Sequence, residues 1–162
     1  MALIDTRALT ARKTHGGKVA KVYQEAMRRV KGQGCLRILD FGCGYGQSYD
    51  LLYSVNDRII WHGHDLHQRV SSDCYFERSD LPSIAQWCDI VLLSNVLNVQ
   101  ESWYDLKETL ILAITSVRWG GQLIWNYPKD PRRMPEMTLA KLQEIIKDTM
   151  KYRPDIFSVY VR

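Results

Sequence analysis

The stretch that decides the fold is Leu36-Arg-Ile-Leu-Asp-Phe-Gly-Cys-Gly-Tyr-Gly-Gln47. Its first residues have the pattern of an apolar strand that ends at Asp40, and a helical pattern follows from about residue 47. The residues between them include glycine at every second position, which allows a tight turn and the close approach of a ligand. These are Gly42, Gly44 and Gly46. A strand, a glycine turn and a helix in this order predict a nucleotide-binding cradle.

The acid at Asp40 narrows the class of ligand. The glycine run is G-x-G-x-G with an acid two residues before its first glycine, not the G-x-G-x-x-G of dinucleotide-binding proteins. A carboxylate so close to the turn would repel a pyrophosphate, but it suits a cationic amino-acid group. The pattern therefore favours S-adenosylmethionine over NAD as the ligand of this turn.

Strands and helices alternate along the rest of the chain. The hydrophobic pattern predicts helices over about 17–30, 47–55, 83–87, 103–117 and 138–150. It predicts strands over 36–40, 58–63, 74–77, 89–94, 122–126 and 156–161. This alternation predicts an α/β fold, a Rossmann-like doubly wound and mostly parallel sheet with helices on both faces. Three prolines exclude regular structure from the loop 128–135, which follows a strand and is a candidate for substrate contact.

Length and composition indicate one ordinary globular domain. The chain has 162 residues and a net charge of +4, and no apolar run is long enough to span a membrane. We expect a single domain over 1–162, with a basic segment and helix over 1–34 and the core over 35–162. The N-terminus lacks the layout of a signal peptide. The four cysteines form no C-x-x-C pair, so we expect buried, reduced thiols in a cytoplasmic protein.

The glycine turn resembles the first motif of class I S-adenosylmethionine-dependent methyltransferases. Four later segments fall in the order of that family. They are the acid Asp65, Ser79-Asp-Leu-Pro82, the run Cys88-Asp-Ile-Val-Leu-Leu-Ser-Asn-Val-Leu-Asn98, and Val117-Arg-Trp-Gly-Gly-Gln-Leu-Ile124, in which Trp119 replaces the usual proline. The resemblance covers 36–126. It implies a near-minimal methyltransferase core, with S-adenosylmethionine as the cofactor and S-adenosylhomocysteine as the product.

The resemblance also implies which residues hold the cofactor. Asp65, about 20 residues after the glycine turn, is expected to accept hydrogen bonds from the ribose hydroxyls. Asp80, in Ser79-Asp-Leu-Pro82, is the candidate partner of the adenine amino group. Cys43 is expected to pack under the cofactor. The candidate cofactor residues are Asp40, Gly42, Cys43, Gly44, Gly46, Asp65, Leu66, Asp80, Leu81 and Ser94.

The methyl acceptor has to be inferred from the loops. Polar residues follow the predicted strand 89–94, where they can hydrogen-bond an exocyclic amine or cap the next turn. An amide and an aromatic ring follow the strand 122–126, where they can bind the edge and the face of a base. The Asp/Asn/Ser-Pro-Pro-Tyr motif of common DNA amino-methyltransferases is absent from the sequence. The candidate catalytic residues are Ser94, Asn95, Asn98, Asn126 and Tyr127.

The excess of positive charge can attract a nucleic acid partner or can form a solvated helix face, and both interpretations stay open at a net charge of +4. The basic candidates are Arg12, Lys13, Lys129, Arg132 and Arg133. The segments 95–101 and 6–13 are similar to small methyltransferase-like proteins of DNA-modification systems and phages. We therefore predict methylation of a nucleic acid base, with adenine N6 of DNA favoured and little sequence specificity, in the cytoplasm of a bacterial or phage-infected cell.

Two other functions stay open at this point. A small-molecule methyltransferase would have a closed apolar pocket and an activity insensitive to salt, whereas DNA binding weakens as salt rises. A non-catalytic cofactor-binding subunit would show no turnover alone, and a homodimer or a partner subunit is compatible with either. The histidines around Asp65 (His62, His64 and His67) lack a cysteine pair or a second ligand cluster, so no metal is expected.

Overall fold

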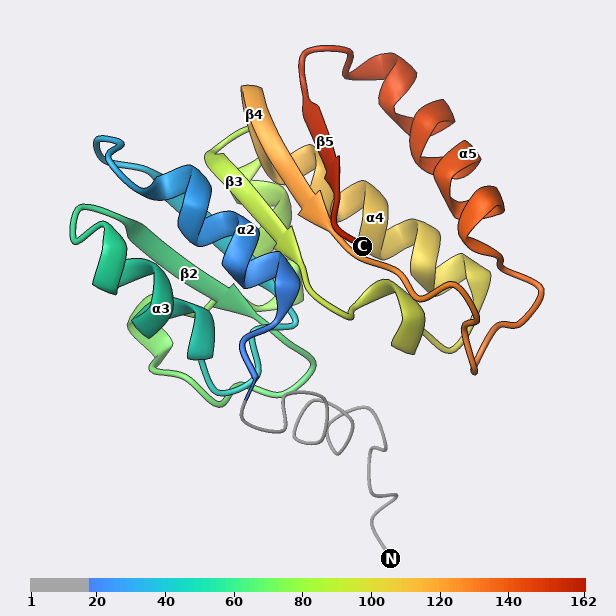
Figure 1. Ribbon diagram of the computed structural model, residues 1–162, viewed down its shortest axis with the longest axis horizontal. Helices are drawn as coiled ribbons and strands as arrows, with labels where there is room; N and C mark the ends of the chain where they lie inside the picture. Colours follow the sequence, from blue (N-terminus) through green and yellow to red (C-terminus); the bar gives the residue numbers. More distant parts are fainter. Residues whose placement is uncertain (1–17) are drawn as a thin grey trace, which may run out of the picture.

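The computed structural model describes residues 18–162, which form a five-stranded, fully parallel sheet in the order β2-β1-β3-β4-β5 (Figure 1). The predicted doubly wound α/β sheet is confirmed. The strand order reverses between β1 and β3, and open sheets of this kind bind ligands at the carboxyl ends of the strands around such a point. The strands are β1 (Arg37–Phe41), β2 (Ile60–His64), β3 (Cys88–Leu93), β4 (Val117–Trp125) and β5 (Phe157–Tyr160).

Helices cover both faces of the sheet. The helices α2 (Lys21–Val30) and α3 (Gln47–Val55) pack on one face, and α4 (Trp103–Ser116) and α5 (Leu139–Thr149) pack on the other (Figure 1). α4 and α5 begin where the sequence supplies an N-cap, because the side chains of Ser102 and Thr138 each accept an N–H of the first turn. Within 18–162, no helix combines the length and the apolar character needed to cross a membrane.

The β4 strand differs most from its predicted limits, because it begins at Val117 instead of residue 122. Its register against β3 shifts between Cys88 and Ile90, and Gly121 lies at this irregularity. A Cβ atom on Gly121 would lie 2.9 Å from the Asp89 carbonyl oxygen. The glycine pair therefore lies inside a strand and permits its close approach to β3, whereas the hydrophobic pattern predicted a strand that begins only after the pair.

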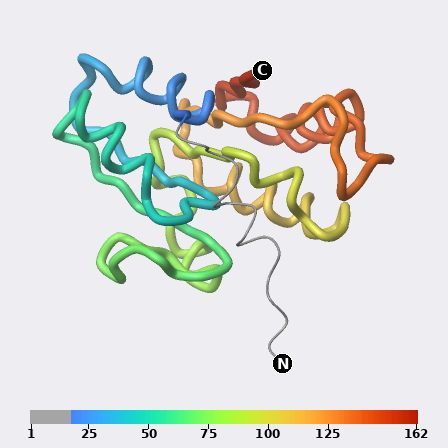
Figure 2. Tube along the Cα trace, turned by 60° about the horizontal axis from the view of Figure 1, so that its bottom comes forward, coloured from blue at the N-terminus to red at the C-terminus, as the bar shows by residue number. Residues whose placement is uncertain are grey.

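The predicted strand over 74–77 and the predicted helix over 83–87 are both wrong. Tyr75 makes a single parallel bridge to Gly63, between 3-10 turns at Ser72–Cys74 and Arg78–Ile84. The second turn starts early because Glu77 and Asp80 form a reciprocal capping box. Pairing therefore stops after one residue and leaves β2 at the edge of the sheet. In Figure 2 the stretch between β2 and β3, in green, folds into a lobe instead of continuing the sheet.

The cysteines are only partly as predicted. All four are free, and Cys43 and Cys88 are buried, whereas Cys35 is exposed and Cys74 is half-buried. Cys35 lies in the turn between α2 and β1, whereas Cys74 lies in a 3-10 turn and packs against the core on the α2 and α3 side of the sheet.

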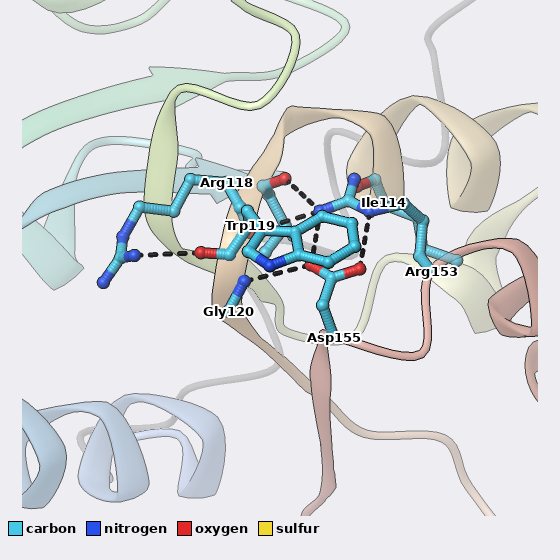
Figure 3. Close-up of polar contacts among 7 residues, drawn as sticks. Ile114, Arg118, Trp119, Gly120, Arg153 and Asp155 are labelled. Atoms are coloured by element: carbon cyan, nitrogen blue, oxygen red, sulfur yellow. Dashed lines mark hydrogen bonds and ion pairs between the residues drawn. The ribbon is translucent and has the colours of Figure 1, made fainter.

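One ion pair organises the amino edge of the sheet, where β4 and β5 begin (Figure 3). Arg153 donates to both carboxylate oxygens of Asp155 at 3.0 Å. Asp155 also accepts the N–H of Gly120 at 3.0 Å, and the hydrogen bonds from Arg153 lower the pKa of its carboxyl to about 2. The same guanidinium donates to the main-chain carbonyls of Ile114, Val117 and Arg118. The end of α4, the start of β4 and the start of β5 are thus joined through one side chain.

Candidate cofactor and acceptor site

The glycine turn joins β1 to α3 at the carboxyl edge of the sheet. Its first two N–H groups, of Gly42 and Cys43, donate to the His64 carbonyl at 2.7 and 3.1 Å, which fastens the turn to the end of β2. Gly44 has a φ of +53°, in the left-handed region that glycine adopts at least cost. Among residues 18–162, no atom outside the adjacent residues lies within 4 Å of the place a Cβ on Gly44 would take. The turn therefore presents open space at Gly44.

Gly42 meets a protein neighbour instead of open space. A Cβ atom on Gly42 would lie 2.5 Å from Cγ2 of Val96. Val96 belongs to the loop after β3, directly after the candidate catalytic residues Ser94 and Asn95. The glycine turn and this loop, the acceptor loop (residues 94–100), are therefore in direct contact.

Asp40 is the last residue but one of β1, and its carboxyl group is fully buried behind the glycine turn. The hydroxyl of Ser48, in the first turn of α3, donates to its Oδ2 at 2.5 Å, and the Trp61 indole N–H donates to Ser48 Oγ at 2.9 Å. Its Oδ1 has no hydrogen-bond partner among the described residues. Burial raises the pKa of Asp40 to about 7, against the hydrogen bonds from Ser48 and Tyr23. A cation placed at Oδ1 would favour the ionised form.

Asp65 lies across the same turn from the end of β2. Its Oδ2 accepts the N–H of Gly44 at 2.7 Å and its Oδ1 accepts the N–H of Leu66 at 2.7 Å. The nearby charge of Asp65 also contributes to raising the pKa of Asp40, so both carboxylates act on this turn. Two acids at a glycine turn oppose a phosphate and favour a ligand with positive charge.

The other candidate cofactor residues differ in how available their side chains are. Asp80 is exposed, and its Oδ2 accepts the Glu77 N–H in the capping box. Leu81 is buried in the core on the α4 side of the sheet. Cys43 is also buried, and its Sγ lies 2.5 Å from the place a Cβ on Gly63 would take. Burial raises the pKa of its thiol, which does not favour the thiolate of a nucleophile.

An amide pair links the acceptor loop to the end of β4. Asn126 Oδ1 accepts the N–H of Asn95 at 2.7 Å, and Asn126 Nδ2 donates to Asn95 Oδ1 at 2.9 Å. Asn95 has a φ of +57°, a left-handed conformation that asparagine tolerates better than most residues. The pair brings together two of the predicted catalytic residues from different strands and fixes the path of the loop.

The acceptor loop also holds polar atoms that the protein itself leaves unused. Ser94 Oγ and Asn98 Oδ1 are buried, and neither has a hydrogen-bond partner within residues 18–162. Buried polar atoms of this kind are rare in folded proteins, and each calls for an explanation such as a bound group. Both atoms can accept a hydrogen bond from an N–H.

Tyr127 is not available as the predicted stacking residue in this conformation. Its side chain is buried, and its hydroxyl donates to the Met137 carbonyl at 2.9 Å, which closes the loop between β4 and α5. The same loop carries the exposed residues Lys129 and Arg132. Arg133 donates to the Val99 carbonyl at 3.4 Å, so this basic loop lies against the acceptor loop. Arg12 and Lys13 lie outside the described residues.

Two of the histidines near Asp65, His62 and His64, contact Phe76, although Nδ1 of His62 is buried with no hydrogen-bond partner among the described residues. His62 stacks on Phe76 with ring centroids 4.5 Å apart, and a ring nitrogen of His64 bonds the Phe76 carbonyl at 2.8 Å. Burial lowers the pKa of both imidazoles. In the described part of the chain, no group of three or more His, Cys, Asp or Glu side chains is placed to hold a metal ion.

Sequence reasoning missed two residues that orient the candidate acids. Ser48 bonds Asp40, and the Tyr75 hydroxyl donates to the Asp65 carbonyl at 2.5 Å. A serine in the first turn after the glycine run was visible as a signal for the first. For Tyr75 the sequence predicted a strand, so its contact with Asp65 was hidden.

The structure, but not the sequence, is similar to known proteins. No protein-family model and no curated protein matches the sequence. The structure is similar to the complex between the Haloferax volcanii Trm112 methyltransferase activator and a protein described as a methyltransferase, with a TM-score of 0.55, 15% identity, and 90% of this chain and 72% of that chain covered. The chain has a class I methyltransferase fold. The structure is also similar to an arsenic(III) S-adenosylmethionine methyltransferase from Chlamydomonas reinhardtii, with a TM-score of 0.52 and 14% identity. The match covers 81% of this chain and 62% of that chain.

Proposed function

We propose that the protein transfers a methyl group from S-adenosylmethionine to an exocyclic amine of a nucleic acid base. One observation supports this above the others: the contact of Gly42 with Val96. It places a glycine turn flanked by two acids next to a loop with unpartnered hydrogen-bond acceptors. A cationic methyl donor and an amine acceptor would then bind side by side, as methyl transfer requires.

The residues of the glycine turn fit S-adenosylmethionine. The open side at Gly44 admits a ligand, and the unpartnered Oδ1 of Asp40 can pair with the ammonium of its methionine end. Asp65 would exchange its bonds to the Gly44 and Leu66 N–H groups for the ribose hydroxyls. The cofactor supplies an activated methyl group on a sulfonium.

The acceptor loop would hold and orient the amine. Ser94 Oγ and Asn98 Oδ1 would accept hydrogen bonds from the two N–H groups of the amine, and this would turn the nitrogen lone pair towards the methyl group. The Asn95–Asn126 amide pair keeps the loop in place. As the N–C bond forms and the C–S bond breaks, the amine releases one proton to water, and S-adenosylhomocysteine remains. The main contribution of the protein is alignment.

The basic loop supports a polyanionic substrate. Lys129 and Arg132 are exposed beside the acceptor loop, where they can bind phosphates while a base enters the site. Within this class we propose adenine N6 of DNA as the acceptor, with little sequence specificity.

A partner subunit is a second proposal, because the Haloferax volcanii neighbour is a complex with an activator. In that case the isolated chain binds the cofactor and shows little turnover alone. A substrate screen with the isolated chain separates the two proposals.

The test is incubation with labelled S-adenosylmethionine and unmodified DNA, RNA, protein extracts and metabolites in parallel, followed by mass spectrometry of nucleosides. We expect N6-methyladenine from DNA, and an activity that falls steeply as salt rises. If label appeared in the metabolites and not in nucleic acid, the proposed acceptor would be wrong, and the methyl acceptor would be a small molecule.

Cofactor binding is tested separately by calorimetry with S-adenosylhomocysteine. Asp65→Ala should weaken binding by about 100-fold, since two charge-assisted hydrogen bonds are worth roughly 3 kcal/mol together. Asp73→Ala removes an exposed acid from the same stretch and serves as the matched control. Equal affinity of the two variants would show that the cofactor site is elsewhere.

A further inference from the structure

A groove separates α5 from the edge strand β5, on the far side of β4 from the glycine turn. Figure 1 shows α5 standing outside this edge. The groove has a volume of about 450 Å³. Its lining combines the apolar residues Trp125, Ile146, Met150, Pro154 and Ile156 with the polar residues Gln143, Lys147, Lys151, Arg153 and Ser158.

The edge of β5 along this groove is an open template for another strand. Within residues 18–162, β5 pairs with β4 alone, and the N–H of Val161 donates to the Trp125 carbonyl at 2.8 Å. Backbone groups of successive strand residues point to opposite sides, so those of Ser158 and Tyr160 point away from β4. An exposed row of this kind binds an extended peptide by β-augmentation.

The side chains around this edge are suited to such a peptide. The Trp125 indole N–H donates to Ser158 Oγ at 3.0 Å, and the Trp125 ring packs on Tyr160 with centroids 4.8 Å apart. These contacts hold the edge and the apolar floor in one rigid unit. A strand laid along β5 would direct every second side chain towards this floor and α5.

The charges of the rim select the kind of peptide. The charged residues that line the groove are all basic, Lys147, Lys151 and Arg153. Arg153 is paired with Asp155 and Lys151 with Asp148. Lys147 is exposed, and it makes no ion pair within 4 Å among residues 18–162. The rim therefore has positive charge available for an acid of the partner.

We propose that the groove between α5 and β5 binds an extended segment of a partner polypeptide in which apolar and acidic residues alternate. The segment adds a sixth strand to the sheet beside β5. Its apolar side chains fill the floor at Trp125 and Ile146, and its acids meet Lys147. This site does not depend on the cofactor or the acceptor loop, so the peptide binds whether or not the protein transfers methyl groups.

The first measurement uses a fluorescein-labelled peptide of about eight residues, alternating aspartate and isoleucine, long enough to span a strand such as β5. Fluorescence anisotropy gives its dissociation constant with the whole protein. We expect saturable binding, no binding of the same peptide with lysine in place of aspartate, and no binding of a version N-methylated on alternate amides. Equal binding of all three peptides would overturn the proposal, as would no binding of the first.

The second measurement locates the site. Lys147→Glu should weaken binding of the acidic peptide at least about fivefold, whereas Lys141→Glu, on the same helix but outside the groove lining, should change it by less than about twofold. Hydrogen exchange should slow at the Ser158 and Tyr160 amides when the peptide binds. Slowing only at the β2 edge would place the peptide elsewhere and refute the proposal.

A second copy of this chain is the alternative occupant. Sedimentation of the protein without peptide separates the cases. We expect a monomer for both the natural chain and Lys147→Glu. A dimer that Lys147→Glu dissociates would show that the groove is an interface between copies, and the proposal of a separate partner would be wrong.

Discussion

The two ends of the sheet treat polar groups in opposite ways. At the amino edge, Arg153 and Asp155 satisfy each other and four main-chain groups (Figure 3). At the carboxyl edge, Asp40 Oδ1, Ser94 Oγ and Asn98 Oδ1 are buried without a partner in the described chain. The amino edge therefore contributes stability by itself, while the carboxyl edge keeps buried polar atoms that a ligand could satisfy. On this basis we propose that the two edges are a structural end and a functional end of one small domain.

Removing Arg153 should give the largest effect, and on stability alone. Arg153→Met keeps the apolar stem but leaves the largely buried Asp155 carboxylate and three carbonyls without their donor, which should lower the free energy of unfolding by about 3 kcal/mol. Urea denaturation measures this, with the exposed Arg58→Met as control. Affinity for S-adenosylhomocysteine should stay within about twofold. If Arg153→Met instead lost affinity for S-adenosylhomocysteine and kept its stability, the assignment of the amino edge to stability would be wrong.

Removing the charge of Asp40 should have the opposite effect and stabilise the protein, and the size of this effect should depend on pH. Its pKa is raised to about 7 in the fold, so the folded state binds more protons than the unfolded chain between about pH 4 and 7. Its contribution to stability is complete below pH 4 and is lost as pH rises through 7. Asp40→Asn should therefore stabilise the protein at pH 8 by about 2 kcal/mol and flatten this pH dependence.

The same substitution should damage binding. If the ionised carboxylate pairs with the ammonium of the cofactor, the affinity of the natural chain should increase as pH rises towards 7, by up to about tenfold per pH unit. This increase should be absent in Asp40→Asn. Calorimetry at pH 6 and pH 8 measures it. Asp50→Asn, in the first turn of α3, is the control. Affinity independent of pH in the natural chain would remove Asp40 from the cofactor site.

The Asn95–Asn126 amide pair should give the smallest effect on stability, because only two part-buried hydrogen bonds are lost. Asn126→Ala removes two hydrogen bonds and should cost about 1 kcal/mol of unfolding free energy, with a clear loss of methyl transfer as the acceptor loop shifts. Asn126→Asp keeps the acceptor for the Asn95 N–H and should retain more of both. Full activity in Asn126→Ala would show that the loop is positioned by other contacts.

The features that were predictable from the sequence are local ones. Asp40 and the glycine turn lie at the end of the apolar strand β1, and Asp65 directly follows β2, so the placement of both acids at the turn follows from the strand limits. The lobe after β2 was not predictable, because a four-residue β pattern at 74–77 cannot outweigh the capping box of the 3-10 turn at Arg78–Ile84. β4 was predicted too short, because its glycine pair has the pattern of a turn.

The long-range contacts of the site could not be predicted either. The partner of Asn126 is 31 residues away at Asn95, and the pairing depends on β3 lying beside β4. Tyr127 was expected at a base, but it follows a strand that directs its ring into the core, where its hydroxyl holds the Met137 carbonyl. Alternation along a strand predicts burial only when the last residue of the strand is known.

The contact of Gly42 with Val96 has a consequence for how this chain tolerates change. A glycine of a ligand-binding motif is usually taken to be fixed by the ligand, yet here a valine of the acceptor loop fills the space that a Cβ would need. The two positions should therefore show epistasis. Gly42→Ala would be selected against beside valine and partly rescued by Val96→Ala, which removes the steric overlap and leaves only the strain of a φ of +76°. A library varied at both sites would recover them as a pair, so the shape of the acceptor loop limits which glycine motifs this fold accepts.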